Sequence, residues 1–103
     1  MPYNDDLIIV ADSGNNRIVI INEETRECID VIGNSEIGLV DGSFDEASFH
    51  FPQGLCHVYR EGDHVIYVCD VKNHAIREIN LTRREVLTVV GTGKVNLLRN
   101  ERK

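Results

Sequence analysis

The sequence predicts an all-β protein made of about two four-stranded antiparallel sheets that repeat one unit. A shift of 58 residues lays 7–35 over 65–93 without a gap, and 11 of the 29 aligned positions are identical, against roughly two expected from ordinary residue frequencies. Runs such as 7–11 and 65–69 are apolar on both faces, whereas a half-solvated sheet alternates apolar and polar residues. Both faces of such a strand must therefore be covered.

The strands follow in order from β-branched runs bounded by Asp, Asn, Thr and Gly. The second copy predicts strands at 65–69, 75–80 and 86–90. A fourth is expected at 54–59, since Pro52 just before a strand costs no ladder hydrogen bond. In the first copy only residues 1–6 precede the first strand, too few to supply the innermost one.

These expectations divide the chain into four parts. A partial unit of three strands takes residues 1–35, a connecting loop takes 36–52, a complete unit of four strands takes 53–94, and a polar tail takes 95–103. Stacking repeated four-stranded sheets around an axis is the β-propeller, whereas a β-sandwich does not explain why the unit recurs. Two units cannot close a ring, so we expect an open propeller segment.

The motifs resemble a known family. VIYVCDVKNHAIREINL resembles the NHL-repeat pattern of an apolar strand, Asp, a short turn with Asn-His, then Ile-Arg-x-Ile, and LIIVADSGNNRIVII is its sibling. The stretches DGSFDEASFHFPQG and VLTVVGTG are similar to the long loop and the blade-closing strand of that family. The resemblance to the NHL-repeat β-propellers implies a ring of about six blades, of which this chain holds fewer than two.

Several repeated polar residues and glycines are interpreted as structural. Asp after a strand accepts backbone N–H bonds, and Asn tolerates a left-handed conformation. Gly at the end of the last strand of each copy permits positive φ where the chain leaves the blade. These turn residues are Asp12, Asn15, Gly33, Asp70, Asn73 and Gly91.

The connecting loop carries four apolar residues with an expected packing role. We predict that they fold this loop back onto the blades, and we prefer this interpretation to one in which the aromatic rings stack on a cofactor. They are Phe44, Ala47, Phe49 and Phe51.

The three cysteines suggest neither a disulfide framework nor a zinc knuckle, because their count is odd and no Cys-x-x-Cys occurs. Cys28 aligns with Val86 and Cys69 with Ala11, so we expect buried thiols that act as small hydrophobes. A reducing, cytoplasmic compartment fits this usage.

No catalytic residue, metal site or cofactor is expected. The spacings of His50, His57, His64 and His74 match no metal motif. No cysteine is accompanied by a recognisable acid-base partner.

The net charge of −6 and the pI near 5.1 oppose nucleic-acid binding, and no apolar run is long enough to span a membrane. Loops at 12–17, 34–52 and 70–75 should emerge at the same end of the strands and form a recognition surface for a protein or peptide. We therefore expect a non-catalytic protein–protein interaction scaffold, whose partners also include the remaining blades of the propeller. The candidate contacts are Arg17, Asp41, Lys72 and His74.

Two alternatives follow from the family resemblance. Related propellers include lyases and hydrolases that hold a metal in the central channel, with ligands from several blades. Other NHL propellers bind RNA, which requires a basic surface.

Overall fold

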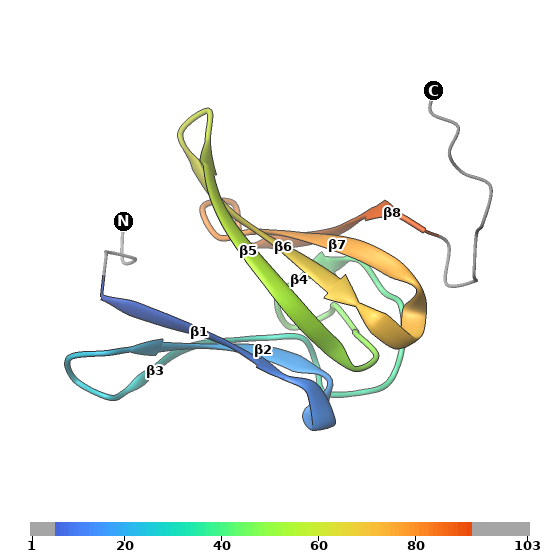
Figure 1. Cartoon of the computed structure of the whole chain (residues 1–103), viewed down its shortest axis with the longest axis horizontal. Coiled ribbons are helices and arrows are strands. Elements are labelled where there is room, and N and C mark those ends of the chain that lie inside the picture. Colours follow the sequence, from blue (N-terminus) through green and yellow to red (C-terminus); the bar gives the residue numbers. More distant parts are fainter. Residues whose placement is uncertain (1–5, 92–103) are drawn as a thin grey trace.

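A computed structural model describes residues 6–91 and consists of two antiparallel sheets that face each other (Figure 1). The first sheet has the order β1-β2-β3 and the second has the order β4-β8-β7-β6-β5, and neither is closed. The fold is therefore all-β and has the form of an open propeller segment, as predicted. The first-sheet strands are β1 (Leu7–Asp12), β2 (Arg17–Asn22) and β3 (Cys28–Ile32). The second-sheet strands are β4 (Gly42–Ser43), β5 (Pro52–Arg60), β6 (Asp63–Asp70), β7 (Ala75–Asn80) and β8 (Glu85–Val90).

The sequence repeat is also a repeat of strand pairing. Ile8 in β1 lies opposite Ile21 in β2, and the aligned Ile66 in β6 lies opposite Ile79 in β7. β5 adds a strand beside β6 that β1 has no equivalent of among the described residues. The predicted tail at 95–103 lies outside those residues.

The short strand β4 was not predicted. Gly42 and Ser43, within the connecting loop, pair with Val86 and Glu85 of β8 and make the second sheet five-stranded. Gly42 has φ +141°, which favours glycine, so the Asp-Gly pair marks a bend that brings the loop onto the sheet edge.

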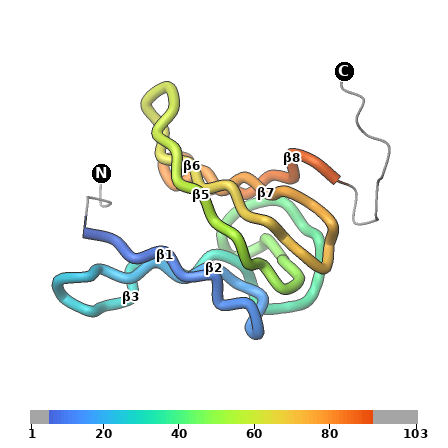
Figure 2. The backbone as a smooth tube through the Cα atoms, in the orientation of Figure 1, coloured from blue at the N-terminus to red at the C-terminus, as the bar shows by residue number. Residues whose placement is uncertain are grey.

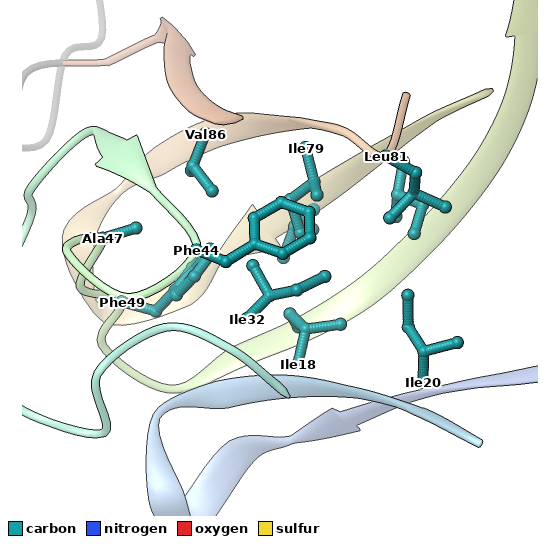
Figure 3. Close-up of a cluster of buried hydrophobic side chains, with 11 residues drawn as sticks. Ile18, Ile20, Ile32, Phe44, Ala47, Phe49, Ile79, Leu81 and Val86 are labelled. Carbon is teal, nitrogen blue, oxygen red and sulfur yellow. The ribbon is translucent and has the colours of Figure 1, made fainter. Parts of the chain in front are cut away.

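The hydrophobic core lies between the two sheets and receives side chains from three sources (Figure 3). The first sheet contributes isoleucines of β2 and β3, the second contributes aliphatic residues of β6, β7 and β8, and the connecting loop contributes Phe44, Ala47 and Phe49. These three loop residues are buried as predicted, whereas Phe51 is only half-buried. Leu81, in the turn after β7, also belongs to the core, whose sheet residues are Ile18, Ile20, Ile32, Ile66, Val68, Ile79 and Val86.

Each sheet has one covered and one uncovered face within the described part of the chain. Ile66 on the covered face of the second sheet is fully buried, but the aligned Ile8 on the outer face of the first sheet is 43% exposed. The contact between the sheets therefore explains why one face of each sheet is apolar. It does not explain why the other face is apolar.

The prediction of buried cysteines is wrong. Cys28, Cys56 and Cys69 are all exposed free thiols. Cys28 lies opposite Ile21, and Cys69 opposite Ile76, on the outer faces of the two sheets, where the described residues provide no cover. Their counterparts Val86 and Ala11 lie on the covered faces, so alignment with a small hydrophobe does not by itself predict burial in this chain.

The two strand-ending glycines have the predicted backbone conformation. Gly33 has φ +108° and Gly91 has φ +98°, a region that side-chain-bearing residues rarely adopt. Across residues 6–91 no helix has the length and apolarity needed to cross a membrane.

Candidate functional site

Three loops converge at one end of the strands and form the surface that we call the loop face, residues 12–17, 34–52 and 70–75 (Figure 2). Hydrogen bonds join them: the Ser13 hydroxyl donates to the Pro52 carbonyl at 2.5 Å, and the Phe51 N–H donates to the Asn16 side chain at 2.8 Å. The Lys72 N–H donates to the His50 carbonyl at 3.0 Å. The predicted clustering of these loops is thus confirmed, and their backbones are fixed by one another.

Two equivalent turns form the corners of the loop face. Each is a short 3-10 turn, Ser13–Asn15 or Val71–Asn73, followed by a left-handed residue. That residue is Asn16 or His74, with φ 57° and 52°, not the Asn15 or Asn73 that we predicted. The 3-10 turn occupies three residues before the chain reverses, which moves the left-handed position one residue onward.

Asn15 and Asn73 fix the turns through their side chains instead. The Asn15 amide donates to both carboxylate oxygens of Asp12 at 3.2 Å, and the Asn73 amide donates to Asp70 at 2.7 Å. Asn73 also donates to the Gly38 carbonyl at 2.8 Å, which holds the connecting loop against the second turn.

A buried arginine, which the sequence analysis did not single out, organises the second half of the loop face. Arg77 of β7 is fully buried, and its Nη1 donates to Asp70 at 2.8 Å and to the Ser48 carbonyl at 2.7 Å. Its Nη2 donates to the Val40 carbonyl at 2.7 Å and to Asp41 at 3.1 Å. Its Nε has no hydrogen-bond partner in the structure.

The position of Arg77 has a sequence signal that could have revealed it. A charged residue stands in an otherwise apolar register, opposite Val68, and an aspartate precedes it by seven residues. Because a buried charge needs a partner, this pairing was available from the strand pattern. The centre of the Phe49 ring lies 4.7 Å from the guanidinium carbon, so the ring stacks against the charged group.

Asp41, a predicted contact, is engaged within the chain. Its carboxylate accepts hydrogen bonds from the Thr88 N–H at 3.0 Å and the Thr88 hydroxyl at 2.7 Å, besides that from Arg77. Partial burial alone would raise the pKa of Asp41, but the bonds from Thr88 and the charge of Arg77 outweigh it and lower the pKa. The residue ties the connecting loop to β8.

Arg17, the second predicted contact, pairs with its own turn. Its Nε lies 2.8 Å from Asp12, and the two side chains are 35% and 28% exposed. The hydrogen bonds from Arg17 and Asn15 lower the pKa of Asp12.

Lys72 and His74, the remaining predicted contacts, are both exposed. The Lys72 ammonium lies 5.1 Å from the centre of the half-buried Phe51 ring, a cation–π distance. A cation, an aromatic ring and an imidazole therefore share the edge of the second turn. Together they offer a positive charge, an aromatic surface and a hydrogen-bonding ring on one exposed edge.

The histidines are distributed between two ends of the second sheet. His57 and His64, near the β5–β6 turn, lie 3.1 Å apart between Nε2 and Nδ1, away from His50 and His74 on the loop face. Within residues 6–91 no three His, Cys, Asp or Glu side chains come close enough together to hold a metal ion.

Comparison with known proteins shows clear relatives. The chain is 38% identical over 86 residues to NHL repeat-containing protein 2 of Gallus gallus and 37% identical over 90 residues to that of Homo sapiens. It is also 37% identical over 86 residues to the Arabidopsis thaliana protein named SUPPRESSOR OF QUENCHING 1, chloroplastic. No family model matches the chain.

The matched region covers 84–85% of this chain but only 11% of the two animal proteins and 8% of the plant protein. The chain thus spans about a tenth of the length of the curated relatives it matches. Together, the internal repeat, the stacked antiparallel sheets and these relatives show that the chain belongs to the NHL-repeat family and forms a β-propeller segment.

Proposed function

We propose that this NHL segment is a non-catalytic scaffold whose loop face binds a protein or peptide. The observation that carries the proposal is the convergence of three loops that are held rigid by hydrogen bonds and buried charge. Loops on a rigid scaffold are where recognition usually resides, because an ordered loop loses little entropy on binding.

The chemistry of the exposed edge indicates the kind of partner. Lys72 and Phe51 offer charge and an aromatic surface, and His74 adds an imidazole. Elsewhere the loop face is rich in exposed carboxylates, including Glu36, Asp45 and Glu46, which disfavour a polyanion such as RNA. A peptide that combines a carboxylate with cationic or polar groups satisfies both regions.

A cytoplasmic location is part of the proposal. Three free thiols are exposed on the sheet surfaces, and such cysteines are kept reduced in the cytosol. Neither nucleic acid nor a membrane is proposed as a partner.

The repeat itself supplies the variant that tests the loop face. In the first turn the positions of Lys72 and His74 are taken by Gly14 and Asn16, with the same backbone. The double substitution Lys72→Gly/His74→Asn therefore removes the ammonium and the imidazole and keeps the residues that form the equivalent first turn. A photo-crosslinking amino acid at position 72 identifies bound proteins, and the affinity of a purified partner is then measured by titration calorimetry.

We expect the double variant to raise Kd by about tenfold or more, because a few central contacts carry most binding energy. The matched control is Arg83→Ala, which removes an exposed cation at the opposite end of the same sheet. An unchanged Kd in the double variant, or an equal loss in the control, would show that the partner does not bind the loop face.

A further inference from the structure

The uncovered faces of the two sheets are related to the covered ones by the 58-residue repeat. In the second sheet, the covered face includes Ile66, Val68 and Ile79. Their equivalents in the first sheet, Ile8, Val10 and Ile21, lie on its uncovered face. The first sheet therefore presents outward the same face that the second sheet presents to the core.

The reverse relation holds for the other pair of faces. In the first sheet, Ala11, Ile18 and Ile32 face the core. Their equivalents Cys69, Ile76 and Val90 lie on the uncovered face of the second sheet. Each uncovered face is thus equivalent to the covered face of the other sheet. The two uncovered faces therefore repeat the two surfaces that meet inside the chain.

Both uncovered faces carry apolar side chains, and that of the second sheet also carries the ion pair of Arg60 and Glu78, whose Nη2 and Oε1 atoms are 3.6 Å apart. On the first sheet, Val10, Val19 and Val31 form one cross-strand row, and Ile8 lies beside Ile21. On the second sheet, a hollow of about 230 Å³ lies over β5, β6 and β7, and the outward-facing residues that line it include Cys56, Tyr67, Cys69 and Ile76. Leu87 on the same face is 46% exposed.

We propose that these two faces bind each other between copies of the chain, so that the first sheet of one copy stacks on the second sheet of the next. The contact resembles the interface inside the chain, because equivalent positions of the repeat meet in both, with Glu78 in place of the core residue Ile20. It is heterologous, since different surfaces of the two copies are in contact, and such contacts lead to rings or filaments.

The contact between copies is weaker than the one inside the chain. Inside, Arg84 forms a two-pronged ion pair with Asp30, with distances of 2.8 and 3.0 Å. The equivalent positions are Arg26 and Thr88, which cannot form an ion pair. We therefore expect association that depends on concentration.

The test uses two variants that each damage one face. Ile8→Glu places a charge on the uncovered face of the first sheet, and Leu87→Glu does so on that of the second. Sedimentation equilibrium of the full 103-residue chain is measured for the unsubstituted chain, for each variant and for their equimolar mixture. Thermal unfolding confirms that each variant is folded.

We expect the unsubstituted chain to form species larger than a dimer and each variant alone to be monomeric. The mixture should form a dimer and nothing larger, because each variant keeps one intact face and the two intact faces are complementary. The matched control Ile37→Glu, at an exposed apolar residue of the connecting loop, should associate like the unsubstituted chain.

A monomeric unsubstituted chain at all concentrations would overturn the proposal, whether or not another protein binds these faces. So would a mixture that stays monomeric, or a single variant that still associates. The Lys72→Gly/His74→Asn variant leaves both sheet faces intact and should associate normally. Failure of this proposal is therefore distinguishable from failure of the loop-face proposal.

Discussion

The two turns of the repeat have the same backbone but different surroundings. Asp12 and Asp70 each lie 2.8 Å from an arginine, yet the first pair is partly exposed and the second is completely buried. The partner also differs, since Arg17 is the first residue of β2, directly after the turn, and Arg77 lies in the middle of β7. The two copies therefore share the geometry of the turn, but the aspartate forms an exposed ion pair in the first copy and a buried one in the second.

Two ion pairs with the same distance between nitrogen and oxygen can therefore contribute very differently to the free energy of unfolding. An exposed ion pair contributes up to about 1 kcal/mol because water screens it. Removal of one partner from a buried pair costs about 3–5 kcal/mol, since the other charge remains without compensation in a low dielectric. Four predictions test this difference, from the largest effect to the smallest.

Replacement of Arg77 by methionine should destabilise the fold by about 3–5 kcal/mol, because Asp70 remains buried and two loop carbonyls lose their donor. Chemical denaturation measures the free energy of unfolding. The matched control is Val19→Met at the equivalent position of the first sheet, which is half-buried and should change stability little. Equal effects at the two positions would contradict the distinction between the turns.

Alanine at Gly91 should cost more than alanine at Gly33. Both glycines have positive φ, which costs about 1–3 kcal/mol for a side-chain-bearing residue. A Cβ at Gly91 would overlap the carbonyl oxygen of His74 and approach the Cα of Ala75 to 2.8 Å, both backbone atoms. At Gly33 it would meet the Phe49 ring at 3.1 Å, and a side chain can shift.

The measurement is the denaturation midpoint of the two single variants and the double variant. The Gly91 substitution should bring the larger decrease. If Gly33→Ala were the more destabilising, the second turn would not be the more rigid of the two.

Ionisation of Asp41 should make the free energy of unfolding depend on pH below neutrality. Because its folded-state pKa lies below the ordinary value of 3.8, the unfolded chain binds more protons between the two values. This stabilisation is fully present above 3.8 and is lost as the pH falls through the folded-state pKa. The side chain is 43% exposed, so the effect should be below about 1 kcal/mol.

The test compares the chain with Asp41→Asn, which cannot ionise, by denaturation from neutral pH to below 3.8. The stability difference between them should shrink as the pH falls. Asp45→Asn, in the same loop, controls for the loss of one negative charge. A difference that stays constant with pH would refute the role of the Asp41 carboxylate.

Arg17→Ala should have the smallest effect, below about 0.5 kcal/mol, because the pair that it breaks is exposed to solvent and salt. The substitution copies Ala75, the equivalent residue of the second turn. High salt should abolish even this difference. A loss comparable with that of Arg77→Met would place the first turn in the same energetic class as the second.

The sequence was sufficient to predict the strands because β-branched runs and turn residues act locally. The predicted strand at 75–80 coincides with β7, and the predicted burial of Phe44, Ala47 and Phe49 is confirmed. The loop face could be predicted as well, since strand direction alone determines which loops share an end.

The features that were missed depend on three-dimensional context. The Arg77 cluster draws on loop carbonyls 29 and 37 residues away, which no local pattern reveals. The exposure of Cys28 and Cys69 depends on which of two apolar faces is covered, and the strands look alike from both sides. The predicted left-handed positions were one residue too early, because the sequence does not distinguish a 3-10 turn from a tighter turn.

The connecting loop also has a consequence for how the protein unfolds. Its carbonyls at Phe44 and Ala47 accept hydrogen bonds from Gly33 and Asn34, and its β4 pairs with the second sheet. Because the loop supplies core residues to the interface as well, neither sheet can open without breaking contacts of the other. The described region should lose its structure in one cooperative transition, with the amide protons of the central strand β7 exchanging last.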